Sequence, residues 1–462
     1  MRGVALCEVA LVLAMVGCEG CRACLGGPGA RRPASPQVVE MRGAEVLWGY
    51  SYAAPGSWLA YELADEVRLW RHRSGGQAVW TRRGRRLLVN GQPHGVDLTG
   101  LPSARAARWL RGHRGWERWV VLDGDALTPA VVRCLRRARR LGLALVSRPG
   151  GRLDLRRLGP LATRLVALSL KEADLTHEGL ARVAGLRRLE ALSLAGARLG
   201  STALGPLGRL GSLRLLDLTD VPVRDLGFGS GLAGLRRLLV AGTLVTDGSL
   251  DALGPLGRLR VVDLSRTGVS DFGVDRLTGL TGLRSVDLAD TGVTDLGADL
   301  VAGLGGLRVL RLGPNLTDVG LSHLEDLVGL RVLALRRTAV TGDGLAHLAR
   351  LRRLQSLDLA WTDVGDAALR HLRGLARLRH LDLGRTQVTG AGFHHLGQSR
   401  RLTDLVLRWT PLERRHLDKL AGLRNLRKVD LTGTPGDRSG PVLRAAGSGR
   451  RAQPGSTPSS AK

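Results

Sequence analysis

Pairs of apolar residues separated by one position recur along most of this chain at intervals of 22 to 24 residues. The first members of the twelve clear pairs are Leu168, Leu192, Leu216, Leu238, Val262, Val286, Leu310, Leu333, Leu357, Leu381, Leu405 and Val429, and weaker copies begin at Val96, Trp119 and Leu143. Such a regular period is typical of a solenoid, in which stacked repeats share one continuous core. The pattern therefore predicts up to 15 repeats over residues 96–433.

Each repeat is predicted to contain a strand and a short helix. The alternation in residues 286–288 indicates a strand with two side chains facing the core and Asp287 facing solvent. Thr294 and Asp295 then offer an N-cap hydroxyl and an acidic first turn to a helix. Leu300 is expected to point back into the core.

A threonine follows most of the predicted strands and is expected to be structural, its hydroxyl bonding to backbone groups between turns of the solenoid. The column comprises Thr243, Thr267, Thr291, Thr338, Thr362, Thr386, Thr410 and Thr434.

The repeat unit resembles the leucine-rich repeat. Its clearest copy has Leu280, Leu283, Val286 and Leu288 at the apolar positions, and its second half, from Thr291 onward, reads T-G-V-T-D-x-G. Similar units are found in bacterial repeat proteins and, more distantly, in eukaryotic F-box adaptors. The resemblance implies an α/β solenoid, a horseshoe with a parallel sheet on the concave face and short helices on the convex face.

The N-terminus has the features of an export signal. Residues 1–17 combine Arg2, an apolar stretch and a small residue before Cys18, which describes a signal peptide better than a membrane span. The segment ending in Cys18 resembles a bacterial lipobox, although Met15 stands where Leu is usual and Glu8 interrupts the apolar core. We expect Cys18 to be lipidated and to anchor the chain to a membrane; another secreted form, or a signal that is not processed, is the alternative.

The remaining segments flank the repeats. Residues 18–37 are rich in Gly, Pro and Ala and are predicted to be a flexible tether. Residues 38–95 hold all three Tyr and four of the nine Trp, and short apolar runs between glycines predict a β-rich cap on the first repeat or a small binding module. Residues 434–462 are predicted to be a disordered tail.

Charge and composition narrow the functional classes. The 462 residues carry a formal net charge of +28, which favours attraction to polyanions. Because only four of the 69 basic residues are Lys and Ile is absent, the bias of a GC-rich genome accounts for part of this excess, and nucleic acid is not the favoured partner. The densest basic cluster is expected to be a solvated helix face or, alternatively, a contact for anionic lipid or polysaccharide; it comprises Arg133, Arg136, Arg137, Arg139 and Arg140.

Two charged columns are expected on the strand surface. Asp occupies the position between the two apolar residues in six repeats: Asp217, Asp263, Asp287, Asp358, Asp382 and Asp430. Arg stands three residues earlier in several repeats, namely Arg214, Arg260, Arg284, Arg379 and Arg427. We expect the two columns to neutralise each other, with a banded, partner-selecting surface as the alternative.

A third column alternates arginine and tryptophan in four consecutive repeats: Arg337, Trp361, Arg385 and Trp409. At strand spacing these side chains could stack as cation–π pairs, and both types are enriched at interface hot spots. Together with Arg336, His380, Arg408, Asp358 and Asp382, the column is the predicted partner-binding site. The alternative is a self-stacking column that only shields the sheet edge.

The sequence contains no motif of an enzyme. We find no nucleophile elbow, phosphate-binding loop, zinc-protease helix or dinucleotide fingerprint. His323, His347, His371 and His395 are spaced by 24, but duplication of one unit explains this without a metal. No cofactor and no metal are expected.

These features predict a non-catalytic scaffold of the cell envelope or exterior that binds a protein ligand through its concave face. If the signal is not functional, the chain would stay in the cytoplasm. One alternative is a binder of polyanions, and the other is a substrate-recognition subunit in ubiquitin transfer, implied by the resemblance to F-box adaptors.

Overall fold

The structure is a computed structural model that describes residues 80–83, 86–89, 92–113, 119–147, 153–199, 204–423, 425–435 and 443–444. The chain divides into two units, Met1–Val39 and Glu40–Lys462, and every described residue belongs to the second. The predicted signal peptide, Cys18, the tether, the first part of the aromatic segment and most of the predicted tail therefore lie outside the described residues.

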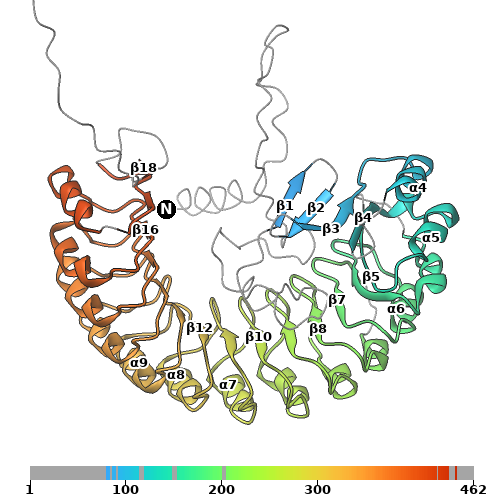
Figure 1. Ribbon diagram of the computed structural model, residues 1–462. Helices are drawn as coiled ribbons and strands as arrows, with labels where there is room; N and C mark the ends of the chain where they lie inside the picture. Colours follow the sequence, from blue (N-terminus) through green and yellow to red (C-terminus); the bar gives the residue numbers. More distant parts are fainter. Residues whose placement is uncertain are drawn as a thin grey trace, which may run out of the picture. The chain divides into compact units, whose positions relative to one another are not determined.

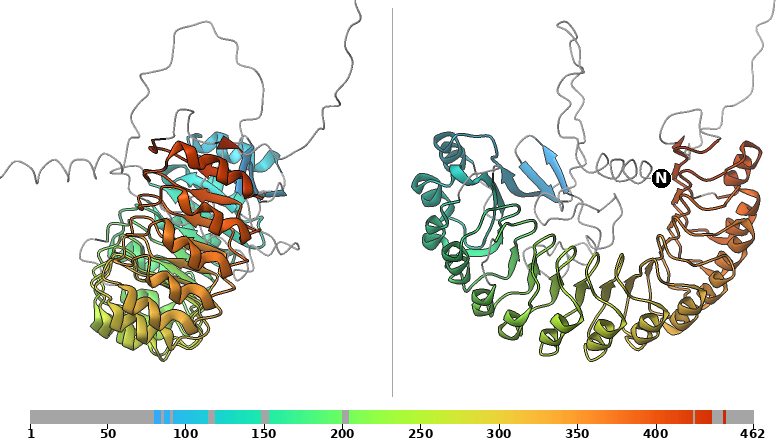
Figure 2. Two further views of the ribbon diagram at one scale, coloured as in Figure 1. Left: turned by 90° about the vertical axis from the view of Figure 1, so that its left-hand side faces the viewer. Right: turned by 180° about the vertical axis from the view of Figure 1, so that it is seen from behind.

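Fifteen strands, one from each predicted repeat, form a parallel sheet in the second unit. They are β3 (Gln92–Asp97), β4 (Trp119–Asp123), β5 (Leu141–Val146), β6 (Leu165–Ser169), β7 (Ala191–Ser193), β8 (Leu215–Asp217), β9 (Arg237–Leu239), β10 (Val261–Asp263), β11 (Ser285–Asp287), β12 (Val309–Arg311), β13 (Val332–Ala334), β14 (Ser356–Asp358), β15 (His380–Asp382), β16 (Asp404–Val406) and β17 (Lys428–Asp430). The strands line the inner face of the curved repeat stack and the helices its outer face (Figures 1 and 2). The predicted solenoid is confirmed.

Antiparallel strands flank both ends of this sheet. At the N-terminal end β1 (Trp80–Arg83) pairs with β2 (Arg86–Val89), and β2 pairs with β3. At the other end β18 (Leu443–Arg444) pairs with β17. The β1–β2 hairpin agrees with the strands predicted in the aromatic segment, and covering the exposed edge of the first repeat is what a cap requires.

The outer face consists of short α-helices and 3-10 helices. The α-helices are α4 (Ser103–Gly112), α5 (Pro129–Leu135), α6 (His177–Ala184), α7 (Asp271–Leu277), α8 (Asp295–Ala302) and α9 (Asp318–His323). The 3-10 helices are η1 (Gly124–Ala126), η2 (Leu155–Leu161), η3 (Gly205–Arg209), η4 (Gly227–Gly231), η5 (Asp247–Leu253), η6 (Leu324–Asp326), η7 (Gly344–Arg350), η8 (Asp366–Gly374), η9 (Ala391–Gln398) and η10 (Arg414–Gly422). In the described residues, none of the helices is long and apolar enough to cross a bilayer.

The paired apolar residues form the core, as the period predicted. Val286 and Leu288 are fully buried, and the register places Val286 beside Leu310 of the next strand. The prediction for the weak repeat at Trp119 was wrong by one residue. The sheet register pairs Val120, not Trp119, with the inward-facing residues of the two neighbouring strands. Because side chains alternate along a strand, this shift of one residue turns Trp119 to the other face, where its ring lies over Gly142.

The helix predicted after Thr294 has the expected N-cap, but the prediction that Leu300 enters the core was wrong. The Thr294 hydroxyl accepts a hydrogen bond from the Leu296 backbone N–H at 3.3 Å, as an N-cap should. Leu300, however, is only partly buried, and Ala298 and Val301 are the helix residues that enter the core. With only eight residues, the helix ends before a wider apolar face can form.

The threonine column acts within each turn rather than between turns. The Thr291 hydroxyl donates to the carbonyl oxygen of Leu288, three residues earlier, at 2.7 Å. All eight threonines make the same bond, at 2.5 to 2.9 Å. The predicted structural role is correct, but the partner lies in the threonine's own turn, because the chain folds back directly after the strand.

A second series of hydrogen bonds, which the sequence did not reveal, ties the helix start to the next repeat in five repeats. Asp295 accepts hydrogen bonds from the Thr317 backbone N–H at 2.8 Å and from its hydroxyl at 2.6 Å. Its carboxylate lies against Gly320, where an added Cβ would come within 2.2 Å of the nearer oxygen. Asp271 makes the same two bonds to Thr294. The Asp of one repeat therefore requires the Gly of the next.

Replacing Asp295 with Ala is expected to lower the free energy of unfolding by about 1 to 3 kcal/mol, because two hydrogen bonds to a charged acceptor are lost. The measurement is the urea midpoint of the purified full chain. Asp299→Ala is the matched control, since this Asp lies in the same helix but is 60% exposed. Equal effects of the two changes would contradict the role of this series.

Candidate functional site

The predicted column of Arg337, Trp361, Arg385 and Trp409, called here the Arg–Trp ladder, lies just beyond strands β13 to β16. Each residue stands two positions after the inward leucine that follows its strand, and all four have positive φ angles of 56° to 64°. The same position is left-handed in other repeats, where it is Glu172, Gly196, Asp220, Gly242, Arg266, Asp290 or Gly433. Glycine at three positions of this column was the feature of the sequence that indicated a left-handed turn, because glycine adopts positive φ angles without steric cost.

Backbone hydrogen bonds hold the strained turns in place. The Arg337 N–H donates to the Ala360 carbonyl of the next repeat at 2.9 Å, and the Trp409 N–H donates to the Thr432 carbonyl at 2.9 Å. A left-handed residue other than glycine costs about 1 to 2 kcal/mol. The bonds between repeats compensate for that cost, so the four side chains leave the sheet edge in one fixed direction.

The four side chains form alternating cation–π contacts, as predicted. The Arg385 guanidinium carbon lies 4.2 Å from the ring centre of Trp361 and 5.2 Å from that of Trp409. The Arg337 guanidinium carbon lies 5.2 Å from the ring centre of Trp361. All three distances fall within the range of attractive cation–π contacts. Trp361 and Trp409 nevertheless stay 40% and 57% exposed, so the stack presents large aromatic surfaces to solvent.

The ladder has a defined end. The next member of the column is Gly433, and a Cβ built there would lie 2.5 Å from the Trp409 ring. The indole therefore lies directly against the Gly433 backbone, which supports the last ring without covering its exposed side.

The aspartate column was expected to face solvent, but this was wrong for four of its six members. Asp217 is 0% exposed and Asp287 is 6% exposed, and Asp263 and Asp430 are buried as well, whereas Asp358 and Asp382 are partly exposed. Each carboxylate accepts a hydrogen bond from the backbone N–H two residues later, as Asp217 does from Thr219 at 3.1 Å. These aspartates brace the turn that follows each strand.

Burial also changes the acidity of this column. It raises the pKa of Asp217 to about 6, and burial together with the neighbouring Asp287 carboxylate raises that of Asp263 to about 7. Burial, followed by the charge of Asp358, raises the pKa of Asp382 to about 6. The pKa values of Asp287 and Asp358 are raised by burial as well.

The predicted neutralisation between the Asp and Arg columns takes a different form. Asp287 pairs with Arg311 of the next strand at 3.4 Å. The Asp430 carboxylate accepts a hydrogen bond from Nε of Arg408 at 2.6 Å and forms an ion pair with its Nη2 at 2.5 Å. Arg311 is the last residue of strand β12, and Arg408 lies in the turn after β16. The predicted Arg column, by contrast, stands three residues before each Asp, where the strand has not yet begun.

The other predicted site residues divide into two groups. Arg336 and Arg408 are exposed at the turns beside the ladder, and between them Asp358 and Asp382 lie next to each other in register. His380 begins β15, at the opposite end of the strand from Arg385, and its Nδ1 lies 2.9 Å from Asp404. The structure therefore joins the two arginines and the two aspartates to the ladder but places His380 apart from it.

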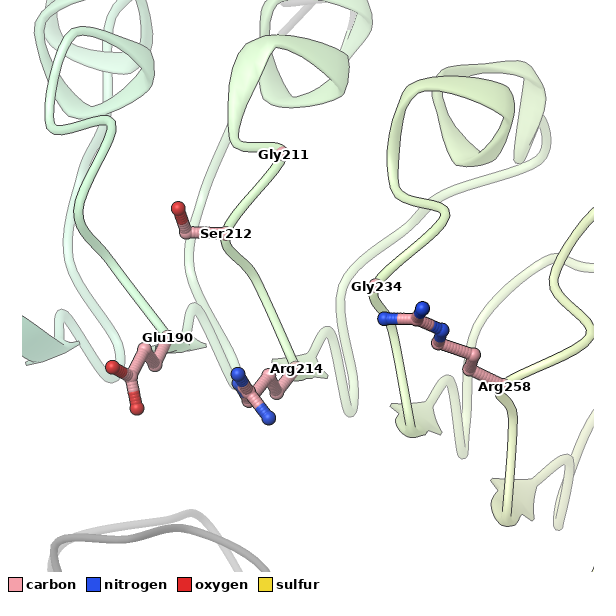
Figure 3. A pocket seen from close by; sticks show the side chains of 6 residues that line it. All are labelled: Glu190, Gly211, Ser212, Arg214, Gly234 and Arg258. Atoms are coloured by element: carbon pink, nitrogen blue, oxygen red, sulfur yellow. The ribbon is translucent and has the colours of Figure 1, made fainter.

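A small hollow lies elsewhere, between the starts of neighbouring strands (Figure 3). It is lined by Glu190, Gly211, Ser212, Arg214, Gly234 and Arg258. The Glu190 carboxylate already accepts a hydrogen bond from Arg140 at 2.6 Å, and the Ser212 hydroxyl is turned away from it (Figure 3). This arrangement does not bring a nucleophile and a base together.

The histidine column does not converge. The Nδ1 atom of His323 lies 3.5 Å from Asp299, whereas the His395 ring contacts that of His394 at a tilt of 45°, with ring centres 3.8 Å apart. In the part of the chain that the structure describes, no group of three or more His, Cys, Asp or Glu side chains could hold a metal ion.

Comparison with solved structures identifies the fold. A leucine-rich-repeat protein of Leptospira interrogans aligns with 69% of this chain and 84% of its own, at 18% identity and a TM-score of 0.51. An internalin of Listeria monocytogenes aligns with 58% of this chain and 80% of its own, at 22% identity and a TM-score of 0.46. No protein-family model and no curated protein matches the chain.

One strand per repeat, an inner parallel sheet and outer short helices define a leucine-rich-repeat solenoid. The chain therefore has the leucine-rich-repeat fold.

Proposed function

We propose that this protein is a non-catalytic scaffold that binds a protein ligand, and that the Arg–Trp ladder is the centre of the binding surface. The observation that carries this proposal is the exposure of Trp361 and Trp409 within a fixed cation–π stack. Tryptophan and arginine are enriched among the few residues that supply most of the binding energy of protein interfaces. Because the stack and the left-handed turns already order these side chains, binding would cost little conformational entropy.

The surroundings of the ladder favour a ligand with both apolar and acidic groups. Arg336 and Arg408 add exposed guanidinium groups on the strand side of the stack. Arg408 is already bound to Asp430, which leaves Arg336, Arg337 and Arg385 to meet carboxylates of a partner. Arginine forms planar, bidentate contacts with carboxylates, which suits an acidic protein surface.

The decisive experiment replaces Trp361 and Trp409 together with Ala in the full chain. A protein partner isolated with the wild-type chain should bind the variant at least about 30-fold more weakly for each tryptophan that acts as a hot spot. Affinity is measured by biolayer interferometry with the purified partner. Removing the rings also removes the stack, so circular dichroism must first show that both proteins are equally folded.

Phe272→Ala is the matched control, because this side chain is also aromatic and is 78% exposed, but it lies on a helix of the outer face. The control should bind like the wild type. Unchanged affinity in the double tryptophan variant would remove the ladder from the interface and leave it as a shield of the sheet edge.

The alternatives make different predictions for the same chain. Binding to polyanions, supported by the net charge of +28, would fall steeply with salt and would not depend on the two indoles. An adaptor of the F-box type would carry a helical bundle before the repeats, whereas the described part of that segment is the β1–β2 hairpin.

We further propose that the protein resides in the cell envelope. This proposal rests on the lipobox-like sequence at Cys18 alone.

A further inference from the structure

The outer face of the first two repeats carries a dense set of exposed arginines. On α4, Arg105, Arg108 and Arg111 are spaced by three residues, and all three are exposed. On α5 and the turn that follows it, the exposed residues are Arg133, Arg136, Arg137, Arg139 and Arg140. The two helices pack side by side on the outer face (Figure 1). We call these eight residues the arginine face.

Helix geometry separates this charge from the core. In α4 the buried residues are Ala106, Ala107 and Leu110, which point opposite to the arginines because a helix turns about 100° per residue. In α5 Val131, Val132, Cys134 and Leu135 are buried in the same way. The sequence revealed the α5 half as a charge run, whereas the α4 half becomes apparent only when the two helices are placed together.

Little in the surroundings neutralises the arginine face. Neither α4 nor α5 contains an Asp or Glu. Arg140 is bound to Glu190 at 2.6 Å, but the structure's described contacts include no ion pair for the other seven arginines. Elsewhere on the outer face the charges are mixed, as in α6, where Glu178 binds Arg182. The field of these seven guanidinium groups is therefore directed outward.

We propose that the arginine face docks onto the anionic headgroups of a lipid bilayer. A convex helical surface with its charges pointing outward fits a broad, flat array of phosphates, and the guanidinium group binds phosphate through paired hydrogen bonds. The aromatic side chain of these helices, Trp109, is half-buried and stacked on His113 at 4.1 Å, so it does not offer a free platform for stacking nucleic-acid bases. This proposal is independent of the Arg–Trp ladder, which lies on repeats near the other end of the sheet.

The test is sedimentation of the full chain with vesicles, in a Cys18→Ala background so that no acyl chain can contribute. Vesicles of phosphatidylcholine containing a third phosphatidylglycerol are compared with pure phosphatidylcholine. Wild-type protein should bind the anionic vesicles, and the binding should weaken with salt. The combined change of Arg105, Arg108 and Arg133 to Gln should weaken the partition coefficient on the order of 100-fold, since each arginine near an anionic surface contributes about fivefold.

The control removes the same charge from distant repeats by changing Arg352, Arg353 and Arg377 to Gln, all of which are exposed. This variant should retain most of the binding. An equal loss in both triple variants would overturn the proposal, because net charge alone would then explain the effect. Equal binding of the wild-type protein to neutral vesicles would overturn the proposal too. So would soluble polyphosphate, at a matched phosphate concentration, if it displaced the protein completely from anionic vesicles, because free phosphate rather than a bilayer would then be the ligand.

Discussion

Replacing Gly231 with Ala is expected to lower the free energy of unfolding by about 1 to 3 kcal/mol or more. A Cβ at Gly231 would lie 2.2 Å from the carbonyl oxygen of Gly208 in the preceding repeat. The obstacle is backbone, with the Gly208 carbonyl carbon and Cα within 3 Å as well, so no side-chain rotation can relieve it. The helices η3 and η4 would have to separate, which would loosen the core between the repeats.

The helix of the preceding repeat supplies a matched control. Gly205 begins η3, and a Cβ there would meet no atom within 4 Å. Gly205→Ala should leave stability unchanged or raise it slightly, because Ala restricts the unfolded chain more than Gly does. Urea midpoints of the two variants and the wild type provide the comparison. Similar midpoints for all three would mean that adjacent helices can move apart freely, contrary to the contact seen here.

The protein is expected to become more stable as the pH falls from 7.5 to about 5. Asp217 and Asp382 have pKa values of about 6 and Asp263 of about 7, all above the ordinary value of 3.8 that they regain when the chain unfolds. Between those values the folded chain binds more protons than the unfolded chain, so acid favours folding. The stabilisation is complete below pH 3.8 and is lost as the pH rises through 6 to 7.

Other groups act in the opposite direction and limit the effect at low pH. Burial lowers the pKa of His371 and His395, so protonation of these residues below pH 6.5 favours the unfolded chain. The pKa of Asp430, which burial would raise, is instead held low by hydrogen bonds from Arg408, and that contribution is lost in strong acid. We therefore expect a maximum of thermal stability near pH 5 rather than near neutrality.

Asp217→Asn isolates the cause. At pH 7.5 this variant should be more stable than the wild type by on the order of 1 to 3 kcal/mol, since it removes the cost of a fully buried charge. Its stability should also depend less on pH between 4 and 7. Melting temperatures across that range provide the measurement, and Asp220→Asn, a half-exposed aspartate of the following turn, is the control. A wild-type melting temperature that rises steadily up to pH 7.5 would contradict the assignment.

The sequence by itself determined the architecture, because the apolar positions of each repeat require neighbouring repeats to bury them. Residues such as Val286 and Leu288 recur at one period, and a single repeat cannot bury them, so stacking follows. The column of Arg337, Trp361, Arg385 and Trp409 was also readable, because equal spacing places its members on neighbouring turns. The α4 half of the arginine face was not, since its arginines follow no column shared with α5 and only the packing of the two helices joins them.

Tertiary structure alone decided the surroundings of each column. Asp287 was expected in solvent because it alternates with core residues, but it is buried in the folded chain, and burial raises its pKa. The bond from Asp295 to Thr317 and the contact of its carboxylate with Gly320 depend on how closely successive helices approach. A periodic sequence specifies which residues stack, whereas the distance between turns, set by packing, determines which of them are covered and which remain free to bind a partner.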